Sequence, residues 1–366
     1  MKFTCERSVL LKEIAIAQEV IASKNAISIL SNIFIEADQD TLSIKATDIK
    51  VNFETKVPVT VLESGSATIF GDKFLGILNS IPEGEMEVEQ SDTKIIIRPT
   101  AKKAKFQLKS IASDKFPEFP VPNLDHLFEM PVKDFKDMIR QTAFAVSDDE
   151  TRYFMTGVLF EKKGDKLIMV ATDGRRLAYI SKPAGAAIQD FPGIIIPPKI
   201  LHVLMKRSGD EGLIAISVTE KILFVRFGSY NLSSVLIEGQ FPNYERVIPE
   251  SQTYSFMVNR QEMLDALKRV SLLVEQKSHR IYFGIAPDTL SLYTEESEIG
   301  TASEEIPCKY DGDEVSIALN YRYIEEPFKV MEDGDIGIHF TDTNKAITIK
   351  PDPEKDFFHI VMPMQA

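Results

Sequence analysis

The fold is decided by a stretch that the chain uses twice: residues 171–177 read ATDGRRL, and residues 46–48 repeat the first three letters. Each copy follows a short strand-like segment, LIMV at residues 167–170 and LSIK at residues 42–45. Thr-Asp-Gly is a common turn string, because glycine accepts positive φ and aspartate bonds to its own turn. After the aspartate the first copy continues IKV and the second GRR. A repeated frame with one decorated copy indicates a scaffold that carries a site.

The distance between the two copies is constant over a long part of the chain. Leu42 and Leu167 are 125 positions apart, and so are the Phe-Pro pairs that begin at Phe116 and Phe241. A third unit follows less strictly, since Leu290 lies 123 positions after Leu167. A fixed period of this kind is the signature of repeated domains. We therefore expect an α+β chain of three similar domains over residues 1–121, 127–247 and 253–366, with stiff proline-rich connectors between them.

Each repeat is expected to contain two amphipathic helices and several antiparallel strands. The first helices are predicted over residues 6–21, 132–146 and 260–274, and the second over 73–81, 199–207 and 321–331. The hairpins are predicted at residues 32–44, 157–169 and 281–292, and later strands at 94–98, 221–226 and 345–350. Pro131 suits a first helical turn, Asn259 with Glu262 a capping box, and Pro327 a kink.

Composition bounds the class of protein. The chain has 366 residues, 44% of them hydrophobic, and a net charge of −13. Its only thiols, Cys5 and Cys308, are too few for a disulfide framework, and no apolar run is long enough for a membrane span. We expect a cytoplasmic protein without a signal peptide. An acidic chain usually avoids nucleic acid, so a DNA-binding function requires a local basic track.

The sequence shows no convergent set of reactive groups, so we expect no catalytic residues, no metal and no cofactor. None of the five histidines has a second His or Cys at metal-ligand spacing, and no phosphate-binding glycine motif follows a strand. The acidic run at residues 148–150 fits a solvated loop better than a metal site. Asp173 beside Arg175 and Arg176 could be an acid–base group, which leaves an enzyme as one alternative.

The chain resembles the bacterial DNA polymerase III beta subunit family, the sliding clamps, over its whole length. The resemblance rests on residues 171–177 (ATDGRRL), 241–244 (FPNY), 152–154 (RYF) and 361–364 (VMPM), in that family's order on a threefold repeat. It implies a homodimer whose subunits meet head-to-tail in a ring around duplex DNA, bound without sequence preference. It also implies a non-catalytic processivity factor that tethers the replicative polymerase alpha subunit, is loaded by a clamp loader, and binds other proteins with a clamp-binding motif.

The resemblance also implies a groove for extended partner peptides that carry a glutamine and apolar anchors. By matched positions it is lined by Met155, Thr172, Gly174, Arg175, Arg176, Leu177, Pro242, Arg246, Val247, Ile360, Val361, Met362, Pro363 and Met364. Methionine and leucine make an adaptable apolar surface of this kind. The chain departs from many relatives at Arg175, where they have histidine, and in its Gln365-Ala366 ending.

Two further surfaces are expected. The residues facing DNA are Lys24, Lys73, Arg152, Tyr153, Lys199, Lys206 and Arg207, on a lining that also carries acidic residues. The dimer interface joins Lys105, Phe106 and Leu108 to Leu272, Leu273, Glu298 and Glu304. Solvated helix faces explain the first set equally well, and an edge strand protected by lysines is the alternative for the second. A scaffold that uses the groove without encircling DNA is the alternative to the clamp.

Overall fold

The computed structural model describes residues 1–365 apart from 22–27, 123–126, 186–187, 208 and 210. Their contacts divide the chain into two compact units: Met1–Phe135 with Ile196–Leu236, and Lys136–Ile195 with Ile237–Ala366. The predicted central domain therefore contributes to both units. None of the described helices is long and apolar enough to cross a membrane.

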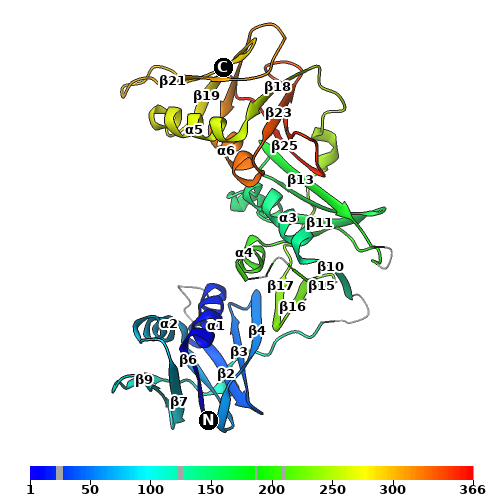
Figure 1. Ribbon diagram of the computed structural model, residues 1–366. Helices are drawn as coiled ribbons and strands as arrows, with labels where there is room; N and C mark the ends of the chain where they lie inside the picture. Colours follow the sequence, from blue (N-terminus) through cyan, green and yellow to red (C-terminus); the bar gives the residue numbers. More distant parts are fainter. Residues whose placement is uncertain (22–27, 123–126, 186–187, 208, 210, 366) are drawn as a thin grey trace. The chain divides into compact units, whose positions relative to one another are not determined.

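The first unit combines one eight-stranded sheet, one five-stranded sheet and three helices (Figure 1). The helices are α1 (Arg7–Val20), α2 (Gly71–Ser80) and α4 (Pro198–Arg207). The strands of the larger sheet, in spatial order, are β10 (Leu127–Pro131), β15 (Leu213–Val218), β16 (Ile222–Phe227), β17 (Tyr230–Val235), β4 (Val51–Pro58), β3 (Thr41–Thr47), β2 (Asn32–Asp38) and β6 (Gly65–Phe70). The smaller sheet runs β5 (Thr60–Glu63), β1 (Lys2–Glu6), β7 (Glu85–Ser91), β8 (Lys94–Pro99) and β9 (Phe106–Lys109).

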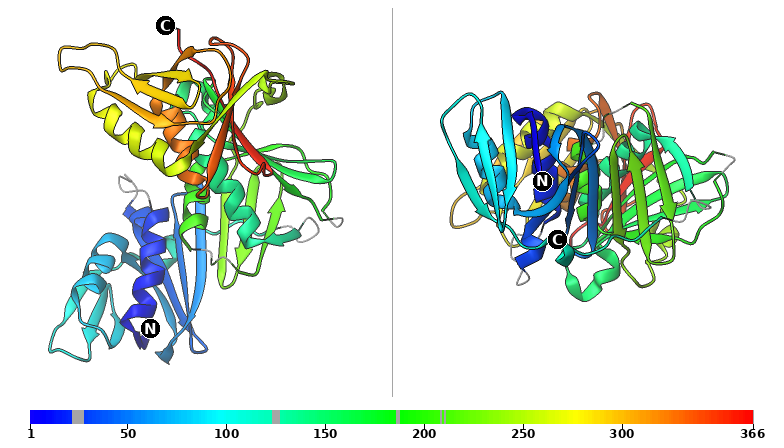
Figure 2. Two further views of the ribbon diagram at one scale, coloured as in Figure 1. Left: turned by 45° about the horizontal axis from the view of Figure 1, so that its top comes forward. Right: turned by 90° about the horizontal axis from the view of Figure 1, so that it is seen from below.

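The second unit repeats this plan with an eight-stranded and a four-stranded sheet. The larger sheet runs β14 (Ile194–Ile196), β11 (Val158–Lys163), β12 (Lys166–Thr172), β13 (Arg176–Pro183), β25 (Phe357–Val361), β24 (Ile347–Pro351), β23 (Asp335–Phe340) and β18 (Tyr254–Asn259). The smaller runs β21 (Ser303–Pro307), β20 (Thr289–Tyr293), β19 (Arg280–Ala286) and β22 (Val315–Asn320). Helices α5 (Arg260–Val270) and α6 (Tyr321–Val330) lie side by side (Figure 2), and α3 (Val132–Thr142) crosses the boundary between the units.

The helices form where the apolar stripes predicted them, but the first helix of each repeat is shorter than predicted. In α1 the side chains of Leu10, Ile14 and Ala17 are all fully buried, as expected of an amphipathic helix that packs on a sheet. The first helix of the central repeat ends at Thr142 and continues as a 3₁₀ turn at Ala143–Ala145. That of the third repeat ends at Val270, before the 3₁₀ turn Ser271–Leu273. A 3₁₀ turn at a helix end keeps the apolar stripe while it ends the α-helical bonding.

Of the local predictions, the one about Pro131 was wrong, the interruption at Pro327 is not seen, and the Asn259 half of the predicted capping box is confirmed. Pro131 ends β10 rather than beginning a helix; β10 is an edge strand, where a missing N–H is tolerated. Pro327 lies inside α6, which runs through it without interruption and buries the ring. Asn259 caps α5, because its side chain accepts hydrogen bonds from the backbone N–H groups of Gln261 and Glu262.

The repeat is visible in how the strands join. β17 pairs antiparallel with β4 in the first unit, and β25 pairs with β13 in the second. In each case the last strand of one repeat pairs with the strand that follows the Thr-Asp turn of the preceding repeat. The strands in the corresponding places of the remaining sheets are β9 and β21, and both are edge strands within the described residues. The repeat thus uses one kind of junction twice and leaves both halves of a third unpaired.

Candidate functional site

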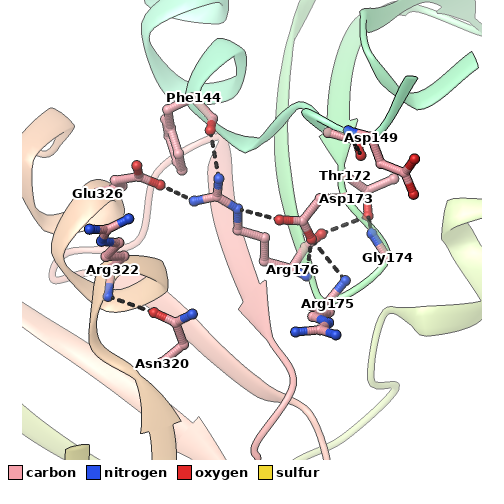
Figure 3. Close-up of polar contacts among 11 residues, drawn as sticks. Phe144, Asp149, Thr172, Asp173, Gly174, Arg175, Arg176, Asn320, Arg322 and Glu326 are labelled. Carbon is pink, nitrogen blue, oxygen red and sulfur yellow. Dashed lines mark hydrogen bonds and ion pairs between the residues drawn. The ribbon is translucent and has the colours of Figure 1, made fainter. Parts of the chain in front are cut away.

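The turn between β12 and β13 is held by its own side chains. Asp173 Oδ1 accepts hydrogen bonds from the backbone N–H groups of Arg175, at 2.9 Å, and Arg176, at 3.1 Å. Thr172 Oγ1 accepts one from the Gly174 N–H at 3.1 Å and donates one to the Arg176 carbonyl at 2.6 Å. Figure 3 shows this closed arrangement. The prediction that Asp173 holds the turn is therefore confirmed.

The first copy of the stretch is built in the same way. Asp48 Oδ1 accepts from the N–H groups of Lys50, at 3.0 Å, and Val51, at 2.7 Å, and Thr47 Oγ1 accepts from that of Ile49 at 2.8 Å. The residue after the aspartate has positive φ in both copies: 89° at Gly174 and 79° at Ile49. The position therefore favours glycine, and the first copy holds a β-branched residue there under strain.

Arg176 joins the turn to helix α6. Its Nε donates to Asp173 Oδ2 at 3.0 Å, its Nη2 donates to the Phe144 carbonyl at 2.8 Å, and its Nη1 pairs with Glu326. Its guanidinium carbon also lies 4.6 Å from the centre of the Tyr323 ring. The side chain is only 11% exposed. Each of the three guanidinium nitrogens thus donates a hydrogen bond within the protein. The side chain of Arg175 points away from this cluster (Figure 3).

The C-terminal tail is attached to the same turn. β25 pairs with β13 so that Leu177 lies opposite Ile360 and Arg176 opposite Val361. Beyond the strand, the Met362 N–H donates to the Arg175 carbonyl at 2.9 Å. The Met364 N–H donates to the Ala318 carbonyl at 2.8 Å. The residues 362–364 are therefore ordered against the protein instead of forming a free tail.

An apolar bed lies beside the turn on the face of the sheet. Leu177 and Ile360 belong to a buried cluster with Tyr244, and Phe241 packs against it. The Tyr244 hydroxyl donates to Glu161 Oε1 at 2.6 Å. Burial, followed by that hydrogen bond to a carboxylate, raises the pKa of Tyr244 well above its usual range. The connector that carries Tyr244 is therefore fixed on the bed.

Several predicted groove residues leave apolar surface next to this bed. Met362 is 42% exposed and Val247, in the 3₁₀ turn Tyr244–Val247, is 50% exposed. Pro242 is half-buried and Arg246 is exposed on the same connector. The strand pairing, the tail bonds and the bed bring together Thr172, Gly174, Arg175, Leu177, Ile360, Val361 and Met362. Pro242, Arg246, Val247, Pro363 and Met364 belong to the same connector and tail segments.

A 3₁₀ segment, Glu150–Met155, borders the turn. Arg152 pairs with Asp149 at 3.0 Å, and its Nη1 lies 3.0 Å from where a Cβ on Gly174 would stand. Hydrogen bonds from Thr151 and then Arg152 hold the pKa of Asp149 below its usual value. Met155 itself is buried. Glycine is therefore favoured at position 174 by its φ, and a Cβ there would press on the side chain of Arg152.

The residues predicted to face DNA are mostly paired within the protein. Lys199 lies 2.5 Å from Asp48 Oδ2 and also donates to the Val20 carbonyl, and Lys206 pairs with Glu19 at 3.0 Å. Lys73 lies 3.3 Å from Asp72. Arg152 pairs as described above, Tyr153 is 52% exposed, and Arg207 ends α4. Lys24 lies outside the described residues.

Three of the residues predicted for the dimer interface lie in β9 and β21, the two strands with an unpaired edge. Lys105 precedes β9, which contains Phe106 and Leu108, and Glu304 lies in β21. Leu272, in the 3₁₀ turn that also holds Leu273, is 77% exposed, and Ile299, beside the exposed Glu298, is 71% exposed. Arg269 donates to Glu304, which lowers the pKa of that carboxyl. Sequence analysis missed Ile299, although an isoleucine within an acidic run is itself a signal.

The partners of Arg176 were also missed. Phe144, Tyr323 and Glu326 come from distant parts of the chain, and nothing in their local sequence identifies them. No group of three or more His, Cys, Asp and Glu side chains is placed to hold a metal ion in the part of the chain that the structure describes.

The chain consists of repeated domains with two helices each, and antiparallel sheets run from one domain into the next. The turn at residues 172–176 and the C-terminal tail lie together on one surface. This combination defines the class of DNA sliding clamps. The models of the DNA polymerase III beta subunit match the whole chain: the N-terminal domain at residues 1–120, the central domain at 129–243 and the C-terminal domain at 245–365. The chain belongs to this family of non-catalytic processivity subunits.

Individual relatives agree with this assignment. The chain is 46% identical to the beta sliding clamp of Treponema pallidum and 26% identical to that of Escherichia coli K12, in each case over all of both chains. It superimposes on the crystal structure of the Pseudomonas aeruginosa sliding clamp bound to griselimycin with a TM-score of 0.93 at 26% identity. For the Bacillus subtilis clamp the TM-score is 0.92 at 27% identity, and the match covers all of this chain and 99% of that one.

Proposed function

We propose that two copies of the chain close head-to-tail into a ring around duplex DNA, and that the ring tethers the replicative polymerase alpha subunit in the cytoplasm. One observation carries this proposal: β9 and β21 are edge strands in the places where the repeat pairs β17 with β4 and β25 with β13. Pairing β9 of one copy with β21 of the other would complete the third junction twice, and a heterologous contact that closes gives a ring. Its three domains would span residues 1–121, 127–247 and 253–366.

The chemistry of the two edges supports their pairing. Lys102, Lys103 and Lys105 precede the β9 edge, whereas Glu304 and Glu305 lie on β21. Exposed Leu272 and Ile299 lie near the second edge and supply apolar surface. Opposite charges around an apolar centre give a specific interface and guard against wrong partners.

The paired lysines support a ring that slides. Lys199 and Lys206 each already have a carboxylate partner, so few lining cations are free to bind phosphates strongly. Phosphate contacts carry no sequence information and weaken with salt. Retention on DNA then comes from encirclement instead of affinity, which reconciles the net charge of −13 with a DNA function.

We also propose that the turn, the connector and the tail form the docking groove for extended peptides of the polymerase, the clamp loader and other partners. The exposed apolar side chains of Met362 and Val247 beside the fixed bed support this. So does Arg175, which is exposed and has its backbone tied to the tail.

The ring is tested by loading the protein on nicked circular DNA. We expect a dimer by light scattering, retention on the circle after loading, and rapid loss once the circle is cut, because linear DNA has free ends. Equal retention on linear and circular DNA would contradict encirclement and favour a scaffold that only binds alongside.

The groove is tested by removing residues 362–366, which lie beyond β25 and so leave its pairing intact. Binding of a peptide with a glutamine and two apolar anchors should fall at least about tenfold, or about 1.4 kcal/mol. The truncated chain should remain a dimer. An unchanged peptide affinity in a titration would refute the groove without touching the ring.

A further inference from the structure

A cavity of about 600 Å³ lies in the first unit, under the connector of residues 116–122 and over one face of the eight-stranded sheet. Four aromatic rings line it: Phe34, Phe116, Phe119 and Phe224. Phe34 and Phe116 lie 5.4 Å apart, and Phe116 and Phe119 6.1 Å apart, between ring centres. The volume is that of a site for a drug-sized group, and the walls are aromatic.

The second unit shows what this place in the repeat is able to hold. There the connector residue Tyr244 is 7% exposed and lies in the apolar cluster with Val170, Leu177 and Ile360. The residue 125 positions earlier is Phe119, which is only half-buried. The repeat therefore buries its own aromatic ring in this place in the second unit, whereas the ring in the first unit stays half-buried.

The floor of the cavity explains why Phe119 does not fill it. In place of Val170 stands Lys45, which pairs with Glu54 at 3.5 Å and lies 5.8 Å from the centre of the Phe119 ring. In place of the Leu177–Ile360 pair stand Asn52 and Ser233, which lie opposite each other and are joined by a hydrogen bond of 3.0 Å. The floor is polar and internally satisfied, so closing a phenyl ring over it would bury polar groups without gain.

The charged residues that line the cavity differ in whether they have an ion-pair partner. Lys45 and Glu54 neutralise each other. Arg226, exposed on β16, makes no ion pair within the described residues; Glu118 on the connector is the other charged group of the lining and likewise has no ion pair there. A free guanidinium beside an aromatic pocket suits a carboxylate next to a ring, since arginine binds carboxylates in a forked geometry.

We propose that this cavity is a second partner site, which takes an aromatic side chain of an extended peptide with an acidic residue beside the ring. The ring would lie among the aromatic walls of Phe34, Phe116, Phe119 and Phe224, without closing over the polar floor. The acidic side chain would pair with Arg226. This site is separate from the docking groove, because all of its residues belong to the first unit.

The absence of tryptophan from the chain allows a direct test. The probes are the capped peptides acetyl-Glu-Trp-Glu-amide and acetyl-Gln-Trp-Gln-amide, whose indole fluorescence is the only such signal in the mixture. With the full-length protein we expect a blue shift and raised anisotropy for both, with the acidic peptide binding about tenfold more tightly at low salt.

Two variants separate the charge from the cavity. Arg226→Gln, at an exposed position, should reduce the affinity for the acidic peptide to that for the neutral one. Asn231→Phe, also exposed and in the lining, should fill the cavity and abolish binding of both peptides. Equal affinities of the two peptides for the unmodified protein would overturn the pairing with Arg226.

Two control variants distinguish peptide binding in this cavity from peptide binding in the docking groove. Removal of residues 362–366 and the variant Arg246→Gln should leave the binding of both tryptophan peptides unchanged. Loss of binding in either of these would place the peptides in the groove and overturn the second site. Absence of any fluorescence change up to millimolar peptide would overturn it as well.

Discussion

Arg176 and Arg175 are adjacent in the sequence and play opposite parts in the structure. The first is 11% exposed and bonded to Asp173, Glu326 and the Phe144 carbonyl. The second presents its side chain to solvent. Both were predicted to line the groove because they match the family's motif. A motif does not show in which direction each side chain points. The difference arises because β13 begins at Arg176, so alternate residues point to opposite faces.

Arg176→Ala should destabilise the protein by about 3 kcal/mol, because two carboxylates and a carbonyl lose their buried partner. Arg175→Ala should change the free energy of unfolding by less than about 0.5 kcal/mol and lower the affinity for groove peptides. Urea unfolding and a peptide titration on both variants provide the comparison. Equal stability of the two variants would contradict the holding role of Arg176.

Ile49 is a second residue whose backbone conformation affects the stability of the protein. It has φ of 79° and is 59% exposed, so its side chain gains little from burial while the backbone is strained. Ile49→Gly should raise the free energy of unfolding by about 1 kcal/mol, since the relief of strain exceeds the entropy that glycine costs. Ile49→Ala keeps the strain and is the matched control, expected within a few tenths of a kcal/mol of the unmodified protein. A gain in both variants would point to the exposed side chain as the cause.

Ion pairs between helices determine how many lysine side chains remain free to contact DNA phosphates. Lys206 of α4 is paired with Glu19 of α1, two elements whose sequences lie far apart. The sequence predicted a lining of mixed charge, without indicating which lysines are paired. The pairing was not predictable, because it depends on which helices the sheets bring side by side.

Glu19→Gln should therefore release Lys206 and strengthen binding to short linear duplex DNA. The slope of log K against log salt should steepen by up to about 0.9, the value for one added phosphate contact. Glu354→Gln makes the same charge change at an exposed pair with Lys350 and should leave the slope unaltered. If the two variants behave alike, net charge and not the released lysine is responsible.

At the scale of the molecule, the proposed third junction would join two edges of opposite charge. Replacing both Lys103 and Lys105 with glutamate should weaken the dimer about tenfold or more, and so should replacing Glu304 and Glu305 with lysine. Mixing the two double variants should restore both interfaces of the ring, one with the native charges and the other with the charges exchanged. Sedimentation at several protein concentrations measures this. Dimers of unchanged strength in the single preparations would place the interface elsewhere.

The repeat itself specified most of the architecture: a period of 125 residues, apolar stripes and turn strings were enough to predict six helices, the hairpins and the role of Asp173. These are local features, determined by side-chain periodicity and by bonds within a turn. The tertiary structure decided which copy of the frame has an apolar bed, where Arg176 finds its partners, and which lysines are neutralised. Each of these includes a contact between residues more than a hundred positions apart, such as Arg176 with Glu326, and the joining of strands across domain junctions brings them together.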